Sequence, residues 1–219
     1  MKDIRILNKK KYKTSAIITS GGSSTRFGSN KLLEKINNKT IIEITISKFI
    51  DLVDEIIIPA KDDIIEHIKN LKLNDDKIIF ATAGKTRQES VYNGLVCCNN
   101  PDIVLIHDGA RPYINQETIQ KTILMTQEKK AVVVGIMAID TIKQVKNGKI
   151  TKTIDRSEIF HAQTPQAFDY NTIFSIHKKH KDNQIFTDDS SMLEFEGIDV
   201  YYLEGSITNK KITTKQDLS

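Results

Sequence analysis

The chain has 219 residues, 39% of them hydrophobic and 27% charged, which suits one buried core, so we expect a single domain over residues 1–219. Its formal net charge is +4, but residues 1–14 alone carry +5 and leave the rest near −1, which excludes nucleic acid as the main partner. No segment is typical of a signal peptide or a membrane span, and the only cysteines, Cys97 and Cys98, are adjacent. We therefore expect a soluble, cytoplasmic protein without a membrane partner, a disulfide framework or a zinc site.

Short runs that are apolar on both faces alternate along the chain with amphipathic segments. The apolar runs predict strands at 15–19, 55–60, 77–82, 102–108 and 131–139. Apolar residues spaced three and four apart predict helices at 40–53, 62–72, 87–98 and 115–130. This alternation predicts an α/β fold with a doubly wound, mostly parallel sheet, in which ligands bind at the carboxyl ends of the strands.

Residues 140–156 break the alternation. Asn147 and Gly148 lie there between two runs of alternating polar and apolar residues, which is a strong β-hairpin signal. Because an isolated two-stranded ribbon is only marginally stable, we expect something to cover it. A second copy of the chain is one interpretation, and an ordinary edge hairpin of the same domain is the other.

The loop "TSGGSSTRFGSNK" at 19–31 follows the first predicted strand. It lacks the glycine spacing of a Walker loop and of a dinucleotide fingerprint. What it offers is a Gly21-Gly22 bend and two cations, Arg26 and Lys31, which suit a triphosphate undergoing displacement at phosphorus. A surface loop with solvated cations is the alternative.

Two further loops follow predicted strands. "AGKTRQESVYNGL" at 83–95 has a glycine turn and then Ser90 at a helix start, where backbone N–H groups favour acceptors. "HDGARP" at 107–112 holds Asp108, which suits a hard cation such as Mg²⁺, and Arg111. Asp108 capping the next turn is the alternative. The three loops are predicted to converge on one crevice.

The ordered set "GGSSTRFG", "AGKTRQESVYNGL", "HDGARP", "DTIK", "TIDR", "QTPQAF", "TDDSSMLE" and "NKKITTKQDL" resembles the 2-C-methyl-D-erythritol 4-phosphate cytidylyltransferase family. The match runs from about Ser15 to Leu218. The resemblance implies a Rossmann-like nucleotidyltransferase with a protruding arm, which uses Mg²⁺ and couples CTP to a sugar-alcohol phosphate in isoprenoid precursor synthesis, giving a CDP-alcohol and pyrophosphate. Relatives that act on ribitol 5-phosphate share most of these motifs, so that substrate is an alternative. A nucleotide-binding module without turnover is a second alternative, which a Lys31→Ala variant would distinguish.

The resemblance also assigns roles to single residues. The implied catalytic residues are Arg26, Lys31, Arg156 and Lys211. The implied CTP contacts are Ser20, Gly21, Gly22, Ser24, Gly84, Lys85, Ser90, Asp108, Gly109 and Arg111, with Asp108 also the metal ligand. The implied contacts to the acceptor alcohol phosphate are Asp108, Arg111, Thr141, Arg156, Thr164 and Lys211. In the family the arm crosses a homodimer, so Thr141 and Arg156 are expected to serve the partner's site.

This chemistry needs no general base, because the attacking phosphate oxygen is ionised near neutral pH. Accordingly we assign no catalytic histidine. His107 is expected to order the Asp108 loop, and His177 and His180 are expected on polar helix faces. "TDDSSMLE" at 187–194 is interpreted as a helix start capped by Thr187, with a metal site at its two aspartates as the alternative.

Overall fold

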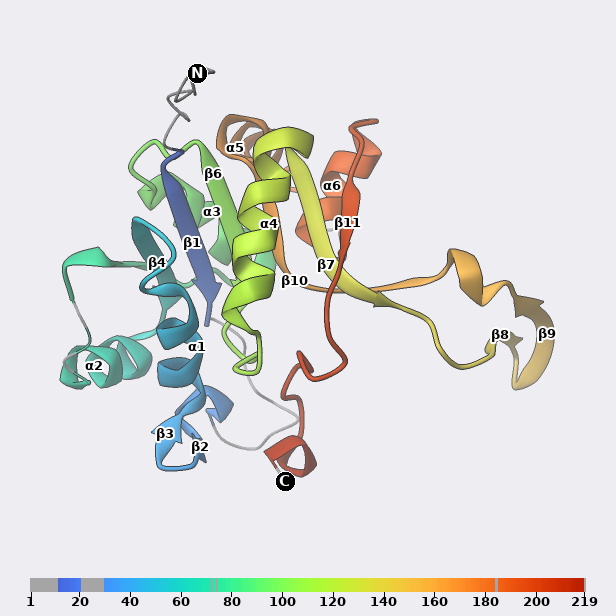
Figure 1. Ribbon diagram of the computed structural model, residues 1–219, viewed down its shortest axis with the longest axis horizontal. Coiled ribbons are helices and arrows are strands. Elements are labelled where there is room, and N and C mark those ends of the chain that lie inside the picture. The colour runs from blue at the N-terminus through green and yellow to red at the C-terminus, as the bar shows by residue number, and fades with distance from the viewer. Residues whose placement is uncertain (1–11, 21–29, 72, 74, 184, 219) are drawn as a thin grey trace, which may run out of the picture.

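The computed structural model describes residues 12–20, 30–71, 73, 75–183 and 185–218, which contain a seven-stranded sheet in the order β11-β7-β10-β6-β1-β4-β5 (Figure 1). Its strands are β1 (Thr14–Thr19), β4 (Glu55–Ala60), β5 (Ile78–Thr82), β6 (Ile103–Asp108), β7 (Ala131–Met137), β10 (Phe160–Asp169) and β11 (Tyr201–Glu204). The helices are α1 (Ile41–Phe49), α2 (Asp62–Asn70), α3 (Arg87–Cys97), α4 (Gln116–Lys129), α5 (Tyr170–Lys179) and α6 (Asp189–Phe195). A two-stranded sheet of β2 (Lys35–Ile36) and β3 (Lys39–Thr40) precedes α1.

Most of the sheet is parallel, as predicted. β1 pairs in parallel with β4 and β6, β4 with β5, and β7 with β11. The five predicted strands correspond to β1, β4, β5, β6 and β7. The sequence did not predict β10, which runs antiparallel between β6 and β7, nor the edge strand β11.

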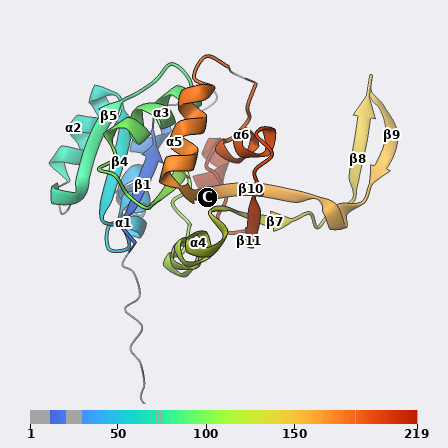
Figure 2. The ribbon, with the colours of Figure 1, turned by 90° about the horizontal axis from the view of Figure 1, so that it is seen from above.

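Helices cover both faces of the sheet, which confirms the doubly wound arrangement. Successive residues of a strand point to opposite faces. Ala16 and Ile18 of β1 accordingly pack in the core under α1, α2 and α4, whereas Ile17 packs with α3, α5 and α6. Figure 2 shows α4 and α5 on opposite sides of the sheet. All three residues are fully buried, and each isoleucine contributes roughly 1.5–3 kcal/mol by its burial.

The predicted hairpin is present at residues 140–156, which we call the arm. β8 (Ile142–Lys146) and β9 (Lys149–Ile154) form an antiparallel pair outside the main sheet, and the arm extends away from the body (Figures 1 and 2). Asn147 and Gly148 have φ angles of 51° and 75°, which is the left-handed pair that a tight hairpin turn requires. Val145 and Ile150 are 59% and 67% exposed, so this chain alone does not cover the arm.

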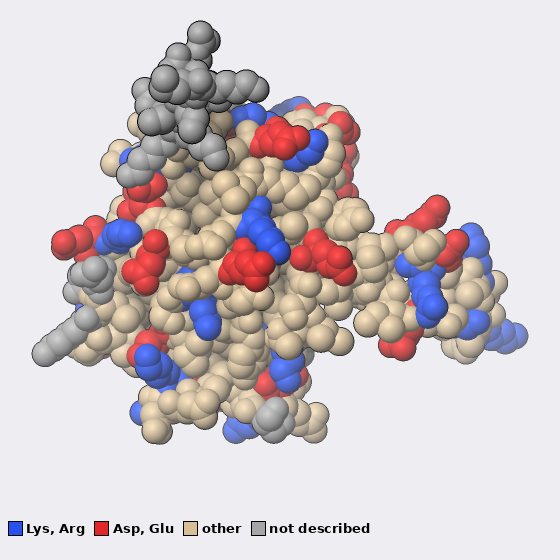
Figure 3. Space-filling model, in the orientation of Figure 1, with Lys and Arg blue, Asp and Glu red and all other residues tan. Residues whose placement is uncertain are grey.

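Charges of both signs are interspersed on the face of the body shown in Figure 3, without a continuous basic area. No helix in the described part of the chain is long and apolar enough to cross a membrane. The cap of α6 differs from the prediction. Asp188, not Thr187, accepts the hydrogen bond from the N–H of Ser191, because the carboxylate one position later is the group that reaches the first turn.

Candidate active site

A cavity of about 580 Å³ lies at the carboxyl ends of β1, β5 and β6, where the sequence predicted a crevice. Described residues at the ends of these strands and in the segments that follow line it together, because parallel strands end at the same edge of the sheet. The described residues that line it are Thr19, Ser20, Lys31, Leu32, Lys61, Ala83, Gly84, Lys85, Thr86, Arg87, Ser90, Asp108, Gly109, Ala110 and Lys211.

Asp108, the last residue of β6, is the carboxylate at the centre of this cavity. Its Oδ2 lies 2.8 Å from Nζ of Lys211 and 3.5 Å from Nε of Arg111, and its Oδ1 lies 3.4 Å from Nε of Arg87. Burial alone would favour the neutral acid, but Arg87 and Lys211, with a smaller effect of Arg111, outweigh it and hold the pKa of Asp108 well below its usual range. Asp108 is therefore an anion held by three cations.

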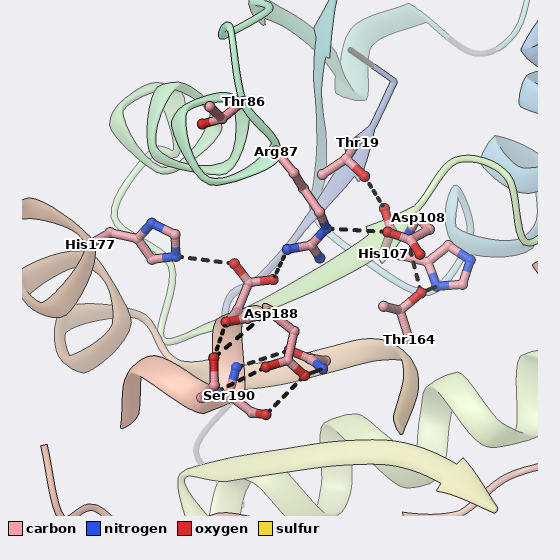
Figure 4. Close-up of polar contacts among 12 residues, drawn as sticks. Thr19, Thr86, Arg87, His107, Asp108, Thr164, His177, Asp188 and Ser190 are labelled. Carbon is pink, nitrogen blue, oxygen red and sulfur yellow. Dashed lines mark hydrogen bonds and ion pairs between the residues drawn. The ribbon is translucent and has the colours of Figure 1, made fainter. Parts of the chain in front are cut away.

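His107 supports Asp108 from inside the protein, as predicted. Its Nε2 lies 3.1 Å from the carbonyl oxygen of Arg111, and its Nδ1 lies 3.1 Å from Oγ1 of Thr164. The same Thr164 hydroxyl accepts the N–H of Asp108 at 3.0 Å (Figure 4). Burial, helped by the charge of Arg111, lowers the pKa of His107 to about 4, so the ring is neutral at pH 7.

The glycine turn after β5 packs too closely for any side chain. A Cβ at Gly84 would lie 2.6 Å from the backbone nitrogen of Ser90 and 2.6 Å from Cβ of Glu89. The N–H of Gly84 donates to Oγ of Ser90 at 3.0 Å, which fixes the turn on the start of α3. A Cβ at Gly109 would similarly lie 2.8 Å from the carbonyl oxygen of Thr19. Both turns therefore offer bare backbone to the cavity.

The two lysines predicted from opposite ends of the sequence lie in the same cavity. Nζ of Lys31 donates to the carbonyl oxygen of Ile212 at 3.0 Å, and Lys211, the neighbour of Ile212, contacts Asp108. The N–H of Ile212 in turn donates to the carbonyl oxygen of Ala110, which holds this C-terminal segment beside the loop after β6. Residues 181 positions apart thus meet at one site.

The other predicted site residues fall into three groups. Ser20, Lys85, Ser90 and Gly109 line the cavity, whereas Gly21, Gly22, Ser24 and Arg26 lie outside the described residues. Arg111 and Thr164 lie behind Asp108, where NH1 of Arg111 donates to the carbonyl oxygen of Asn209 at 2.8 Å. Thr141 and Arg156 belong to the arm, are exposed, and do not line the cavity; Arg156 donates to the carbonyl oxygen of Ile139.

Arg87 is a cavity residue that the sequence reasoning missed. Its NH1 lies 2.8 Å from Oδ2 of Asp189, and Oδ1 of Asp189 lies 3.1 Å from Nε2 of His177 (Figure 4). The prediction of His177 and His180 on polar helix faces is wrong, since they are 0% and 8% exposed. A signal for Arg87 was present, because a cation at the first position of a helix is disfavoured by the helix dipole and needs carboxylate partners.

The mostly parallel sheet and the cation-lined cavity at its strand ends define the class of the protein as an α/β protein with a site for an anionic ligand. The sequence model of the 2-C-methyl-D-erythritol 4-phosphate cytidylyltransferase family matches residues 14–219. The chain belongs to this family.

Individual relatives agree with this assignment. The 2-C-methyl-D-erythritol 4-phosphate cytidylyltransferase of Clostridioides difficile is 43% identical over 215 residues, which cover 94% of this chain and 90% of the relative. The crystal structure of 4-diphosphocytidyl-2C-methyl-D-erythritol synthase from Anaerococcus prevotii superposes with a TM-score of 0.85 at 31% identity, covering 94% of this chain and 93% of that one. The Francisella tularensis 2-C-methyl-D-erythritol 4-phosphate cytidylyltransferase gives 0.80 at 34% identity, covering 94% and 96%.

Proposed function

We propose that this cavity transfers the cytidylyl group of CTP to 2-C-methyl-D-erythritol 4-phosphate, releasing pyrophosphate. The observation that carries the proposal is the meeting of Lys31 and Lys211 with Asp108 at one strand edge. A reaction between two phosphorylated molecules requires cations that come from both sides of the bond being formed. The relatives described above carry the methylerythritol name, so ribitol 5-phosphate is not favoured as the acceptor.

In this proposal the nucleoside lies against the two bare turns. The backbone at Gly84 and Gly109 accepts close approach of a base and ribose, and Ser20, Lys85 and Ser90 line the same side. Gly21, Gly22 and Ser24 would complete it from the loop after β1. Support comes from the steric contacts, since no other residue fits at Gly84 without displacing α3.

The phosphate chemistry is assigned to the cations. Lys31, together with Arg26, would stabilise the charge that develops on the α-phosphate and the pyrophosphate. Lys211 would draw the acceptor phosphate into line for attack on the α-phosphorus, and Arg111 would keep Asp108 in place. Each donor aimed at the transition state is worth about 3 kcal/mol, or roughly a hundredfold in rate.

The donor set also fits Mg²⁺. Among the described residues that line the cavity, Asp108 is the one carboxylate, and no cluster of three or more potential ligands occurs in the described part of the chain. Mg²⁺ commonly binds one or two carboxylates and completes its shell with substrate phosphates and water. Asp108 would hold the ion, which when bound supplies charge neutralisation for the triphosphate.

The arm supports a homodimer in this proposal, with one domain in each chain. Thr141 and Arg156 do not line this chain's cavity, and Val145 and Ile150 on the arm, with Ile139 just before it, expose apolar surface. A second copy would cover that surface and receive both polar residues at its acceptor site. The two free cysteines suit the reducing cytoplasm, which we propose as the location.

The arm assignment is tested with an Ile150→Lys variant. Because Ile150 is 67% exposed, the change leaves the fold of one chain intact. We expect sedimentation to show monomers and the turnover number to fall at least tenfold. A Lys152→Gln variant, also on β9, is the control for altered charge. A fully active Ile150→Lys monomer would contradict the assignment of Thr141 and Arg156 to the partner's site.

The reaction itself is tested by supplying CTP with each alcohol phosphate and measuring pyrophosphate. We expect release with 2-C-methyl-D-erythritol 4-phosphate and at least a hundredfold less with ribitol 5-phosphate. Lys31→Ala should keep most CTP affinity and lose turnover, whereas Lys121→Ala, on the exposed surface of α4, should match the wild type. Equal turnover in Lys31→Ala would remove Lys31 from the mechanism.

A further inference from the structure

Arg87 occupies an unfavourable position that two buried carboxylates explain. It is the first residue of α3, at the positive end of the helix dipole. Its guanidinium lies between Asp108 of β6 and Asp189 of α6, with Nε 3.4 Å from Oδ1 of Asp108 and NH1 2.8 Å from Oδ2 of Asp189 (Figure 4). A planar guanidinium presents five donors in a fixed fork, so it can hold two carboxylates on different edges at once. Of the two contacts, that to Asp189 is the shorter.

Asp189 has a second buried partner, His177. It is 1% exposed, and its second oxygen, Oδ1, lies 3.1 Å from Nε2 of the fully buried His177 on α5. Burial opposes its charge, but Arg87 and then His177 outweigh this and lower the pKa of Asp189. Neither Asp189 nor His177 lines the cavity. A buried line of polar groups therefore runs from α5 through α6 and α3 to the carboxylate in the cavity.

This line of buried polar groups matters most when both substrates are bound. Asp108 is now held on Oδ2 by Lys211 at 2.8 Å, and in the proposed function Lys211 turns towards the acceptor phosphate. Asp108 then keeps Arg87 on Oδ1 and Arg111 on Oδ2, and each guanidinium has an anchor outside the cavity, Asp189 for Arg87 and the carbonyl oxygen of Asn209 for Arg111. Without Asp189, the guanidinium of Arg87 would be drawn to the nearest phosphate and would leave Oδ1 of Asp108 without this partner.

We propose that Asp189, held by His177, is a positioning residue that acts through Arg87 on Asp108. This inference rests on the function proposed above for Asp108 and Lys211. Asp189 touches neither substrate. It fixes the guanidinium so that Arg87 orients the carboxylate instead of following the phosphates. Its removal therefore affects the step in which both substrates are bound more than it affects the binding of CTP alone.

The test compares Asp189→Asn with a matched control in the same two helices. Glu196, at the end of α6, pairs with Lys179 at 2.7 Å and with His180 at 2.6 Å, so it joins α6 to α5 without contacting Arg87. We expect Asp189→Asn to lower kcat at least tenfold with the Kd for CTP changed less than threefold. Glu196→Gln should stay within twofold of the wild type in both quantities. Equal losses in the two variants would show that only the contact between α5 and α6 matters, and would overturn the proposal.

A double-mutant cycle supplies a readout that a merely structural role would not move. If Asp189 acts through Asp108, the Asp189→Asn change should lower kcat less than twofold in an Asp108→Asn background. Independent, multiplicative losses would refute the proposal. His177→Gln, which keeps an N–H donor, should retain kcat within threefold, whereas His177→Leu should lose kcat as Asp189→Asn does. If Asp189→Asn does not fold, these two His177 variants test the proposal in its place. An inactive wild type would instead refute the proposed function, so the two failures are distinguishable.

Discussion

Thr164→Val removes one hydroxyl group while keeping the side-chain volume nearly constant. Nε2 of His107 faces a carbonyl oxygen, which only accepts, so Nε2 carries the proton and Nδ1 accepts from the Thr164 hydroxyl. The hydroxyl oxygen in turn accepts the N–H of Asp108. Valine thus leaves two buried polar groups unpaired, each at a cost of about 1–3 kcal/mol. We expect the free energy of unfolding to fall by about 2–6 kcal/mol.

Urea unfolding followed by circular dichroism at pH 7.5 measures this loss, and the thermal midpoint should fall by roughly 5–15 °C for a chain of this size. Thr164→Ser keeps the hydroxyl and should stay within about 1 kcal/mol of the wild type. The family resemblance gives Thr164 a contact to the acceptor phosphate instead. A Thr164→Val variant with wild-type stability and a raised KM for the acceptor would refute the structural role argued here.

Three further predictions follow from single contacts. Burial lowers the pKa of His107 from 6.5 to about 4, so between these pH values the unfolded chain binds a proton that the folded chain does not. The free energy of unfolding should therefore fall by about 3 kcal/mol as the pH drops from 6.5 to 4. A His107→Gln variant should lack this part of the slope when urea unfolding is measured against pH. Gly84→Ala places a Cβ 2.6 Å from backbone and should raise the KM for CTP roughly tenfold, about 1.4 kcal/mol; an unchanged KM would show that the turn does not face the nucleotide. Burial, with a smaller effect of Glu55, raises the pKa of the Cys98 thiol to about 12, so iodoacetamide at pH 8 should alkylate Cys98 only after unfolding, as peptide mass spectrometry would show.

The parallel part of the sheet was predictable because its strands are buried on both faces and so have near-continuous apolar sequences. β10 was not, since its buried residues include polar ones whose partners are distant in the sequence. Gln166 donates to Oδ2 of Asp188 at 2.7 Å, and the Thr164 hydroxyl accepts the N–H of Asp108 at the end of β6. Read without these partners, "HAQTPQ" has the composition of a loop.

The candidate site was likewise predictable only in part. Asp108, Lys31 and Lys211 were predicted, from the strand-end rule and from the family motifs. The link from Arg87 to Asp189 was missed because a buried ion pair leaves no periodic signal in either segment. His177 was different. It follows Ile173 by four positions, and both residues are fully buried on one face of α5, so helical spacing alone could have placed it in the core.

The charges of the cavity explain why Lys31 and Lys211 each have a protein partner. Five cations and one carboxylate line its described part, namely Lys31, Lys61, Lys85, Arg87, Lys211 and Asp108. Such an excess of positive charge repels itself unless each cation is held or solvated. Lys31 rests on a neutral carbonyl oxygen and Lys211 on a carboxylate that Arg87 and Arg111 share. A polyanion offers both lysines a stronger partner, whereas Arg87, fixed by Asp189, stays with Asp108. In the proposed function, the two lysines would therefore move to the substrates while Arg87 and Arg111 would stay on Asp108.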